Sequence, residues 1–561
     1  MWIPGLTSRL RRLRRYRHIM AVLVKYGLEE VADLIRLRVQ GKAHRPIYYD
    51  TSSPAKYHTR PVRVRLVLEE LGPTFIKFGQ LLSTRPDLIP HDYVVELARL
   101  QDQVAPADPN QIIQTIEQEL GRPIKELFLR FENDPIAAGS IAQVHRAQLP
   151  DKTEVVIKVL RPGIRQLVRT ECQIIKELAS LLQGTIWEGQ GLDLVRMADD
   201  LTEAIIRETD LANERRNILR FAKAFESDPA IHIPRVFEPY CTDTVLTMEY
   251  IDGIKPSPVE ALARHGLDQR LIARRGADFV LRQVFELWIF HSDPHPGNFF
   301  VLPDNVLCPI DFGQVAVLPS TDRRLIGEIL HAIMLNDGAR IVSILDGHQM
   351  LEEQTDQARL SAEIEQLIAN YRNLPLKDIP FNQIFTQVFD LIRTHKVRTP
   401  ARFSLMLKSL ATIESFGKSL DPDFNMAQAI TPYVRQILTA DLKPKRLWQT
   451  LQSSLYRATS MALQLPQDAE LLVRKMRLGR IQVRVHHEHL ENLTKTLDKS
   501  SNRISFALII AALLVASSLL VPQEGKALGF ISLQTLGVAG YVVAAILGIW
   551  LVASIIRSGR L

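Results

Sequence analysis

The chain has few cysteines, and no two of them form a CxxC pair. Its 561 residues include three cysteines, Cys172, Cys241 and Cys308, which stand far apart in the sequence. A disulfide framework needs several cysteines that can pair, and a zinc site needs closely spaced ligands. The sequence therefore excludes both, and it favours a reducing, cytosolic environment.

Long apolar runs are also scarce over most of the chain. Hydrophobic residues make up 46% of the sequence and charged residues 23%. This balance excludes wholesale disorder, a collagen-like repeat and a transporter with many membrane spans. The length is sufficient for three or four domain-sized units, and no internal repeat is visible.

Positive charge is only slightly in excess, but it is unevenly placed. Lysine and arginine number 69 against 62 acidic residues, a net charge of +7, and residues 9–18 (RLRRLRRYRH) hold six arginines. The apolar stretch Ile19 to Val24 is too short for a secretory signal. The basic segment fits a solvated helix end, the anionic leaflet of a membrane or a mitochondrial presequence. No aromatic-rich basic groove follows, so we expect no nucleic-acid partner.

The C-terminal end contains two uncharged runs, residues 504–521 and 527–556. Each is long enough to cross a bilayer as a helix, and the short connection between them makes a hairpin. Lysine and arginine residues flank the entry and the exit, which places both ends in the cytoplasm by the positive-inside rule. Neither run carries an ionisable side chain, so we predict a membrane anchor rather than a pore. A pair of buried core helices is the alternative.

Between these ends, the periodicity indicates an α+β protein. Residues 20–130 look helical with a Pro-rich break at 104–109, and a further helical pattern resumes near Asp108 or Asn110. The pattern then predicts a strand over 136–149, a turn at 150–153, a strand over 154–160, one long helix over 162–225, strands near 235–237 and 245–250, and helices to about 500. A small sheet followed by a helical lobe places a cleft between two lobes.

The middle of the chain contains the side chains that phosphoryl transfer requires. Lys158 lies in a strand pattern, Asp293 and Asn298 stand five residues apart, and an Asp-Phe-Gly sequence begins at Asp311. Such a reaction needs a cation on the nucleotide phosphates, a carboxylate facing the acceptor and oxygen ligands for magnesium. All three requirements are met in the chain order of a kinase.

These residues belong to a set of motifs that resembles the UbiB/AarF family of atypical protein-kinase-like proteins. The motifs are Lys77-Phe-Gly-Gln80, Ala137-Ala-Gly-Ser140, Glu208-Thr-Asp210, His291 to Asn298 and Asp311-Phe-Gly313, within roughly residues 60 to 330. The resemblance implies a two-lobed kinase-like fold with an N-terminal helical extension. The paired C-terminal runs point to the bacterial ubiquinone-biosynthesis branch.

On this resemblance we expect five segments. They are a basic helical segment (1–60), a helical extension with the Lys77 motif (61–130), a kinase-like N-lobe (131–251), a helical C-lobe with juxtamembrane helices (252–500) and two transmembrane helices (504–556).

The resemblance also assigns roles to residues around the nucleotide. Lys158 matches the phosphate-binding lysine and Glu214 its partner, while Asp293 matches the catalytic carboxylate, and Asn298 and Asp311 match the magnesium ligands. His291 and His295 are expected to order the loop rather than act as bases.

Further nucleotide contacts are expected from the loop and the hinge. The loop consists of Ala137, Ala138, Gly139 and Ser140, and the backbone of Glu249 and Ile251 is placed to meet adenine. The family usually has alanine where this chain has Gly139. Glycine has no Cβ, so it restricts the loop less than alanine does and lets backbone amides approach phosphate. With Gly139 in place of alanine, we expect the loop to hold the phosphates in a less fixed geometry.

The Lys77 motif distinguishes the family from ordinary kinases. The helix that carries Lys77 and Gln80 is expected to cover the cleft where a protein substrate would dock. Lys77 is then expected to pair with Glu208, and Asp210 to lie near the phosphates. A covered cleft favours water or a small lipid head group as the acceptor.

The resemblance thus implies a membrane-anchored kinase-like ATPase that uses ATP and Mg²⁺ in support of ubiquinone (coenzyme Q) biosynthesis. The expected partners are isoprenoid quinone precursor lipids, the membrane and other ubiquinone-biosynthesis proteins, at the bacterial inner membrane with the catalytic part in the cytoplasm. The alternatives are a true protein or small-molecule kinase, a pseudokinase that acts as a lipid-binding scaffold, and a nonspecific DNA-binding protein.

Overall fold

The computed structural model describes residues 4–33, 58–100, 104–183, 193–372, 374–375, 379–440, 490–522, 526–527 and 531–557. The chain forms two compact units, Met1–Gln449 and Thr450–Leu561, and each is described here by itself. Part of the expected juxtamembrane segment, residues 441–489, and part of the expected basic N-terminal segment, residues 34–57, lie outside the described residues.

The first unit contains a five-stranded antiparallel sheet in the order β1-β3-β4-β5, with β2 also paired to β3. The strands are β1 (Arg130–Phe131), β2 (Ala137–Ala138), β3 (Ala142–Gln148), β4 (Glu154–Leu160) and β5 (Val245–Glu249). The single strand expected over 136–149 is therefore wrong, because the turn at Gly139 divides it into β2 and β3. The strand expected near 235–237 is also wrong, since Val236 forms only an isolated bridge to Met248.

The register of β4 determines where Lys158 lies. Side chains of a strand alternate between its two faces, so Val155, Ile157 and Val159 share one face and are fully buried. Lys158 shares the other face with Val156 and Leu160, which belong to the main hydrophobic core. The lysine therefore lies on the core-side face of the sheet.

Three helices, rather than the predicted single long helix, follow the sheet hairpin. They are α8 (Ile164–Leu182), α9 (Leu194–Glu208) and α10 (Leu211–Ala224). Asp193 and Asp210 begin the last two helices as N-caps, each accepting a hydrogen bond from a first-turn amide. Aspartate is among the strongest N-cap residues, because its carboxylate satisfies otherwise unpaired N–H groups. The two caps explain why the long helix is broken.

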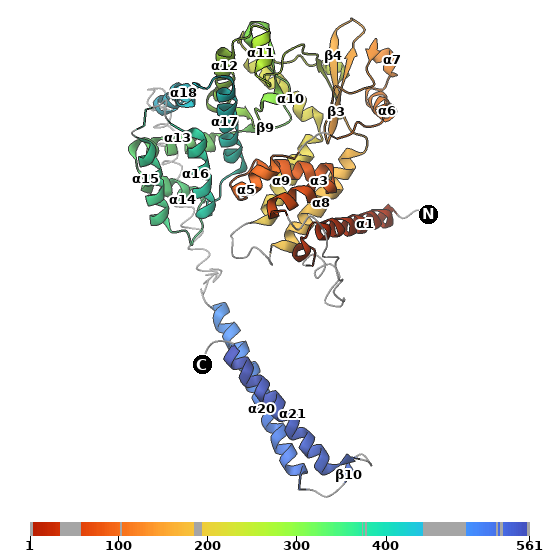
Figure 1. Ribbon diagram of the computed structural model, residues 1–561, viewed down its shortest axis with the longest axis vertical. Helices are drawn as coiled ribbons and strands as arrows, with labels where there is room; N and C mark the ends of the chain where they lie inside the picture. Colours follow the sequence, from red (N-terminus) through yellow and green to blue (C-terminus); the bar gives the residue numbers. More distant parts are fainter. Residues whose placement is uncertain are drawn as a thin grey trace, which may run out of the picture. The chain divides into compact units, whose positions relative to one another are not determined.

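Of the described helices that precede the sheet, the first four pack with α8 and α9 or with one another, and the last two lie beside the sheet (Figure 1). In chain order, the helices are α1 (Pro4–Lys25), α3 (Arg60–Leu71), α4 (Pro73–Ser83), α5 (His91–Leu97), α6 (Pro109–Leu120) and α7 (Ile124–Leu127). Asp108 caps α6, as predicted. In α1, Ile19 and Val22 are buried, and Arg15 pairs with the buried Glu171 of α8 at 2.5 Å. At least one of the six clustered arginines is therefore used within the fold.

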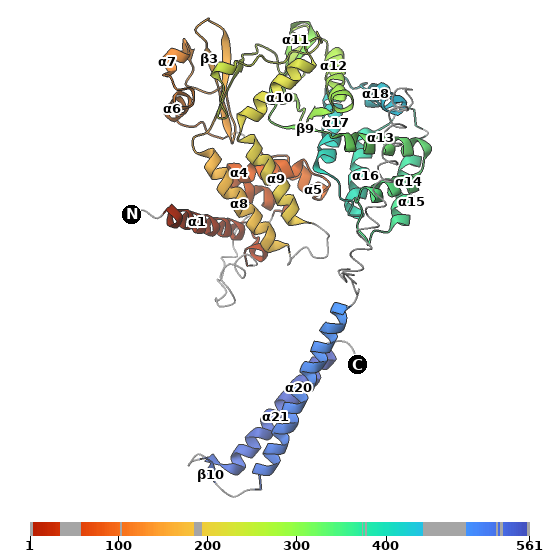
Figure 2. The ribbon, with the colours of Figure 1, turned by 180° about the vertical axis from the view of Figure 1, so that it is seen from behind.

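The second lobe of this unit is mainly helical (Figure 2). Its helices are α11 (Glu260–Arg264), α12 (Gln269–Arg282), α13 (Ser320–Leu335), α14 (Gly338–Gly347), α15 (Gln357–Arg372), α16 (Phe381–Thr394), α17 (Ala401–Leu420) and α18 (Met426–Ala440). The prediction of helices alone is wrong here. Two short antiparallel pairs, β6 (Ile289–His291) with β9 (Val315–Val317) and β7 (Phe299–Leu302) with β8 (Val306–Pro309), interrupt them.

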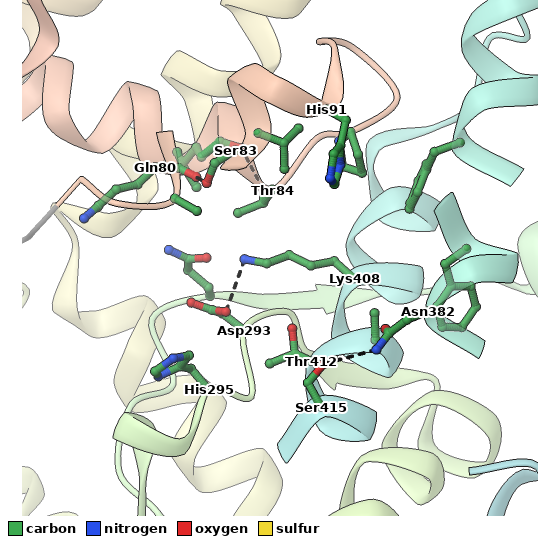
Figure 3. Close-up of a pocket in the computed structure, with 18 of the residues that line it drawn as sticks. Gln80, Ser83, Thr84, His91, Asp293, His295, Asn382, Lys408, Thr412 and Ser415 are labelled. Carbon is green, nitrogen blue, oxygen red and sulfur yellow. Dashed lines mark hydrogen bonds and ion pairs between the residues drawn. The ribbon is translucent and has the colours of Figure 1, made fainter. Parts of the chain in front are cut away.

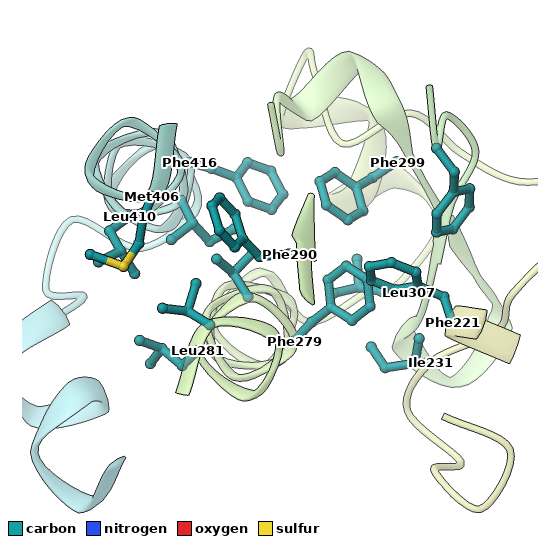
Figure 4. Packing of buried hydrophobic residues seen from close by; sticks show 14 of the residues in the cluster. Phe221, Ile231, Phe279, Leu281, Phe290, Phe299, Leu307, Met406, Leu410 and Phe416 are labelled. Atoms are coloured by element: carbon teal, nitrogen blue, oxygen red, sulfur yellow. The ribbon is translucent and has the colours of Figure 1, made fainter. Parts of the chain in front are cut away.

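Aromatic packing links the two lobes. Phe279 of α12, Phe299 of β7 and Phe416 of α17 are buried together, and the rings of Phe299 and Phe416 stack 6.0 Å apart (Figure 4). Phe221 of α10 lies 6.4 Å from Phe279. One continuous core therefore extends from the N-lobe helix α10 to the C-lobe helix α17, and it holds the residues of the cleft between them.

The second unit contains a hairpin of two apolar helices, α20 (Leu490–Leu520) and α21 (Leu533–Arg557). Residues Ser501–Leu520 and Thr535–Val552 are long and apolar enough to cross a membrane, with mean hydropathies of 2.2 and 2.1. Only 6% and 11% of these windows is buried, which argues against two buried core helices. The second helix begins at Leu533 rather than near Ala527, because β10 (Lys526–Ala527) pairs with β11 (Ile531–Ser532).

The hairpin supplies the first prediction. A Cβ at Gly540 would overlap the hydroxyl of Ser517 on the facing helix, whereas a Cβ at Gly548 would meet no atom within 4 Å. Gly540→Leu should therefore force the two helices apart, at a cost of about 1–3 kcal/mol. Spin labels at Phe506 and Trp550, whose rings lie 5.8 Å apart, should report a longer distance in reconstituted protein. Gly548→Leu is the matched control, and an equal distance in both variants would contradict the packing.

Candidate functional site

Three charged side chains meet at the cleft. The Nζ atom of Lys158, on β4, lies 2.7 Å from Oε1 of Glu214 on α10 and 3.5 Å from Oδ1 of Asp311. Glu214 is only 4% exposed, whereas the side chain of Asp311 is 44% exposed. The structure therefore brings together the predicted phosphate-binding lysine, its predicted partner and one predicted magnesium ligand.

The protonation of these groups follows from their neighbours. Burial raises the pKa of Glu214 to about 7, although Lys158 opposes the shift. Burial would lower the pKa of Lys158, but the attraction of Asp311 and Glu214 outweighs it and raises that pKa. Desolvation disfavours ionisation of Asp311, yet Lys158 and His291 hold its pKa well below the ordinary range. Lys158 is therefore a cation and Asp311 an anion at neutral pH.

Helix α10 also holds the Asp-Phe-Gly segment in place. The ring of Phe312 is fully buried and lies 5.2 Å from that of Phe221. The side-chain amide of Asn217 donates to the carbonyl of Phe312 at 3.0 Å, and the amide of Gly313 donates to the carboxylate of Asp311 at 2.9 Å. These contacts fix the position of Asp311 relative to Glu214.

The loop after β6 is ordered by its histidines, as predicted. His291 is 2% exposed; its Nδ1 accepts the amide hydrogen of Asp293 at 3.0 Å, so its Nε2 carries the hydrogen that is donated to the carbonyl of Asp311. His295 accepts from the amide of Gly297 at 3.1 Å. Asn298 donates its side-chain N–H to the carbonyl of Asp293 at 3.1 Å. The loop thus presents the carboxylate of Asp293 toward the cleft.

The oxygen atoms at the site suit magnesium. Asn298 uses its amide nitrogen toward Asp293, which leaves its carbonyl oxygen available, and Asn298 and Asp311 line the same cavity. Among the described residues, no group of three His, Cys, Asp or Glu side chains is arranged to hold a metal. Magnesium typically takes one or two protein ligands together with substrate phosphates, so these two residues fit an ion that arrives with the nucleotide.

The Lys77 motif lies on α4, and its lysine pairs with Glu208 of α9 at 2.8 Å, the contact that the sequence predicted. Both side chains are only 12–13% exposed. Gln314, directly after the Asp-Phe-Gly segment, donates to the same glutamate at 2.7 Å. Gln80 donates to the carbonyl of Leu100 at 3.1 Å. The Lys77 motif is therefore linked to the Asp-Phe-Gly segment through the carboxylate of Glu208, which both Lys77 and Gln314 contact.

Asp210, expected near the phosphates, serves in the structure as the N-cap of α10. It accepts hydrogen bonds from the amide of Ala212 and from the side chain of Asn213, both at 3.1 Å. A role toward the nucleotide stays a prediction.

The loop between β2 and β3 is tight and tethered. The amide of Gly139 donates to the carbonyl of Ala142 at 2.9 Å, and Arg161 donates to the carbonyl of Gly139 at 2.8 Å. Ser140 is 1% exposed. The described glycines with positive φ do not include Gly139, so its backbone conformation is open to alanine. The loop lies at the sheet edge, and its phosphate contacts remain a prediction.

Glu249 and Ile251, the expected adenine contacts of the hinge, differ in their backbone hydrogen bonds. The amide of Glu249 donates to the carbonyl of Arg235 at 2.8 Å, and its carboxylate pairs with His232 at 2.9 Å. Within the part of the chain that the structure describes, the amide of Ile251 has no hydrogen-bond partner. Ile251 is thus the better candidate donor to adenine, and Glu249 retains its carbonyl as an acceptor.

A cavity of about 780 Å³ lies beside Asp293 (Figure 3). It is bounded by α4, α5, α16 and α17 as well as by the loop after β6. Asp293, Asn298 and Asp311 line it, whereas Lys158 and Glu249 do not. The cavity therefore borders the predicted base and both predicted magnesium ligands.

Sequence reasoning missed one residue of this cavity. Lys408, on α17, lies 3.2 Å from the carboxylate of Asp293, and the close-up shows its side chain reaching across to that loop (Figure 3). The two residues are 115 positions apart. In the sequence, Lys408 is followed at helical spacing by Ala411, Thr412 and Ser415, a pattern too common in helices to single the lysine out.

Comparison with known proteins places these features in one family. Residues 99–345 match the ABC1 atypical kinase-like domain, residues 364–425 the UbiB helical domain and residues 488–557 the ABC1/UbiB kinase-like C-terminal domain. The two-lobed arrangement around the cleft is accordingly a kinase-like fold.

Several curated proteins are similar over most of the chain. A "Probable protein kinase UbiB" of Marinobacter nauticus is 34% identical over 82% of this chain and 86% of its own length. That of Azotobacter vinelandii is 32% identical over 80% and 85%. An uncharacterized protein of Synechocystis, sll1770, is 33% identical over 82% and 79%.

Among solved structures, the complex of Rv3197 with erythromycin from Mycobacterium tuberculosis aligns with 63% of this chain and 90% of that chain. The identity is 24% and the TM-score 0.43, too low to transfer any residue or ligand.

The Lys77–Glu208 contact supplies the second prediction. Lys77 lies in the cavity wall near Asp311, where it adds positive charge next to the expected phosphates. Lys77→Met should weaken MgATP binding by about tenfold, the effect of losing roughly one charge-assisted contact. Glu208→Gln should instead strengthen MgATP binding, because it frees Lys77 to face the nucleotide.

Titration calorimetry with MgATP measures both variants, and thermal unfolding checks that they fold. Lys77→Arg is the control that keeps the charge. Equal affinities in wild type, Lys77→Met and Glu208→Gln would show that this ion pair does not influence the nucleotide.

Proposed function

Because the chain belongs to the ABC1/UbiB family of atypical kinase-like proteins, we propose that it is a membrane-anchored, Mg²⁺-dependent enzyme that cleaves ATP in support of ubiquinone biosynthesis. The observation that carries the proposal is that Lys158, Glu214 and Asp311 meet at the cleft, and that Asp311, Asn298 and Asp293 line the adjoining cavity. Phosphoryl transfer needs a nucleotide site and an acceptor site that meet at the metal ligands and the base.

The nucleotide half of the site binds and orients ATP. Lys158, fixed by Glu214, pairs with the phosphates, and the backbone of the loop from Ala137 to Ser140 covers them. Asp311 and Asn298 would hold magnesium, which when bound would supply positive charge against the transferred phosphoryl group. The backbone of Glu249 and Ile251 contacts adenine.

Asp293 serves as the base. Its carboxylate accepts the proton of the attacking hydroxyl or water as the new oxygen–phosphorus bond forms. The bond between the γ-phosphorus and the bridging oxygen breaks at the same time, and ADP leaves with its electron pair. With water as the acceptor, the products are ADP and inorganic phosphate.

The cavity supports a small acceptor rather than a protein. Its volume is within the range of pockets that enclose small molecules. The helices α4 and α5 form one wall, so a protein substrate would have to displace them. Leu81, Val94, Phe385 and Phe389 supply apolar lining. Such a wall suits an isoprenoid quinone precursor, the substrate class that the family resemblance implies, or water admitted beside it.

The location of the reaction follows from the C-terminal hairpin. Two helices able to cross a membrane, with basic residues at their outer ends, support anchoring in the bacterial inner membrane with the catalytic part in the cytoplasm. At that surface the enzyme has access to hydrophobic precursors and to other ubiquinone-biosynthesis proteins.

The third prediction separates the roles of the two aspartates. Asp311 acts on the bound nucleotide, so Asp311→Asn should weaken MgATP binding about tenfold or more while metal-free adenine nucleotide still binds. Asp293 acts in the transition state, so Asp293→Asn should lower kcat by about 10² with little change in affinity. Calorimetry and phosphate release by the full-length protein measure both effects.

The outcomes also distinguish the alternatives. Addition of quinone-precursor lipid in detergent should raise the rate of phosphate release by wild type. Transfer of label from ATP to a protein or small molecule would identify a true kinase instead. Equal hydrolysis by wild type and Asp293→Asn would reject the enzyme and favour a lipid-binding scaffold.

A further inference from the structure

The catalytic loop lacks a cation of its own on the acceptor side. Between His291 and Asn298 the sequence reads HSDPHPGN, with no lysine or arginine. The structure brings Lys408 to this position from α17, with its Nζ atom 3.2 Å from Oδ1 of Asp293. The lysine is 25% and the aspartate 36% exposed, so neither is a fully solvated surface charge.

Helix α17 places Lys408 on the face that lines the cavity. Lys408, Ala411, Thr412 and Ser415 are spaced three or four residues apart, so they share one face of α17, and all four line the cavity. Figure 3 shows Lys408, Thr412 and Ser415 directed into the cavity from this helix.

The opposite side of α17 is anchored in the protein. Ile413, Phe416 and Leu420 are at most 3% exposed and belong to the main core. Ser409, fully buried, donates its hydroxyl hydrogen to the carbonyl of His291 at 2.9 Å. One helix therefore contacts both the backbone of the catalytic loop and the carboxylate that the loop presents.

Other cations in the cavity wall have other partners. Lys77 pairs with Glu208 at 2.8 Å, and Arg393 pairs with Asp390 at 2.8 Å. Of the lysines and arginines in the described cavity lining, Lys408 is the one that pairs with Asp293.

We infer that Lys408 is a positioning residue for the reaction proposed above, on which this inference rests. Its ammonium group holds the Asp293 carboxylate in the orientation that accepts the acceptor's proton. Nucleotide binding does not involve it, because Lys408 pairs with Asp293, whereas Lys158, the proposed phosphate-binding residue, pairs with Glu214 and Asp311 and does not line the cavity. Loss of Lys408 should therefore lower the rate of turnover and leave nucleotide affinity unchanged.

The test is steady-state phosphate release by full-length protein in detergent. Lys408→Met should lower kcat by about 10- to 100-fold with a KM for MgATP within about twofold of wild type. Lys408→Arg should restore most of the rate, because it keeps a cation on the same helix face. In an Asp293→Asn background, Lys408→Met should reduce the rate by less than about twofold, since the group it positions is already gone.

Lys418→Met is the matched control. Lys418 is the other lysine of α17; it pairs with Glu414 at 2.7 Å but does not line the cavity. It should lower thermal stability without changing kcat. A loss of kcat equal to that of Lys408→Met would show that any broken ion pair on α17 disturbs the enzyme, and would overturn the inference.

The remaining outcomes distinguish failure of this inference from failure of the proposed function. Equal rates in wild type and Asp293→Asn reject the proposed function, and this inference with it. If Asp293→Asn releases phosphate slowly but Lys408→Met releases it at the wild-type rate, only the inference is rejected. Fully multiplicative losses in the double variant reject it as well, because Lys408 would then act independently of Asp293.

Discussion

The structure depends on one shared cation. Lys158 lies between the buried Glu214 and the more exposed Asp311, and its positive charge at close range offsets the cost of placing two carboxyl groups there. Each comes from a different element: a strand, a helix and a loop. The packing of Phe312 against Phe221 fixes the last two relative to each other. Packing in the hydrophobic core between the lobes therefore holds the cluster of Lys158, Glu214 and Asp311 together.

The acceptor side is assembled differently, from segments outside the matched kinase-like domain. Lys77 precedes residues 99–345 and Lys408 follows them, yet both line the cavity that contains Asp293. The cavity is thus lined both by the matched kinase-like domain and by helices outside it. In the proposed function, those outer helices are where the acceptor would be selected.

The sequence predicted which charged residues meet at the cleft because its signals are local, while their roles toward a nucleotide stay predictions. Period-two alternation placed Lys158 on a strand, and short motifs identified Asp293 and Asp311; the hydropathy runs identified the hairpin. The break of the expected long helix was missed, since aspartate caps compete with continuous helical periodicity. Lys408 was missed because its partner lies 115 residues away, and a single lysine on an amphipathic helix carries no local signal.

His291 ties two segments of the site together. Its ring accepts a hydrogen bond from the amide of Asp293 and donates one to the backbone carbonyl of Asp311. In kinases, the packing of the Asp-Phe-Gly phenylalanine distinguishes active from inactive states. Here a rotation of that segment would break this bridge and expose the buried Phe312 ring. For the proposed enzyme, admitting or excluding a reactant would therefore disturb the fold less than rotating this segment.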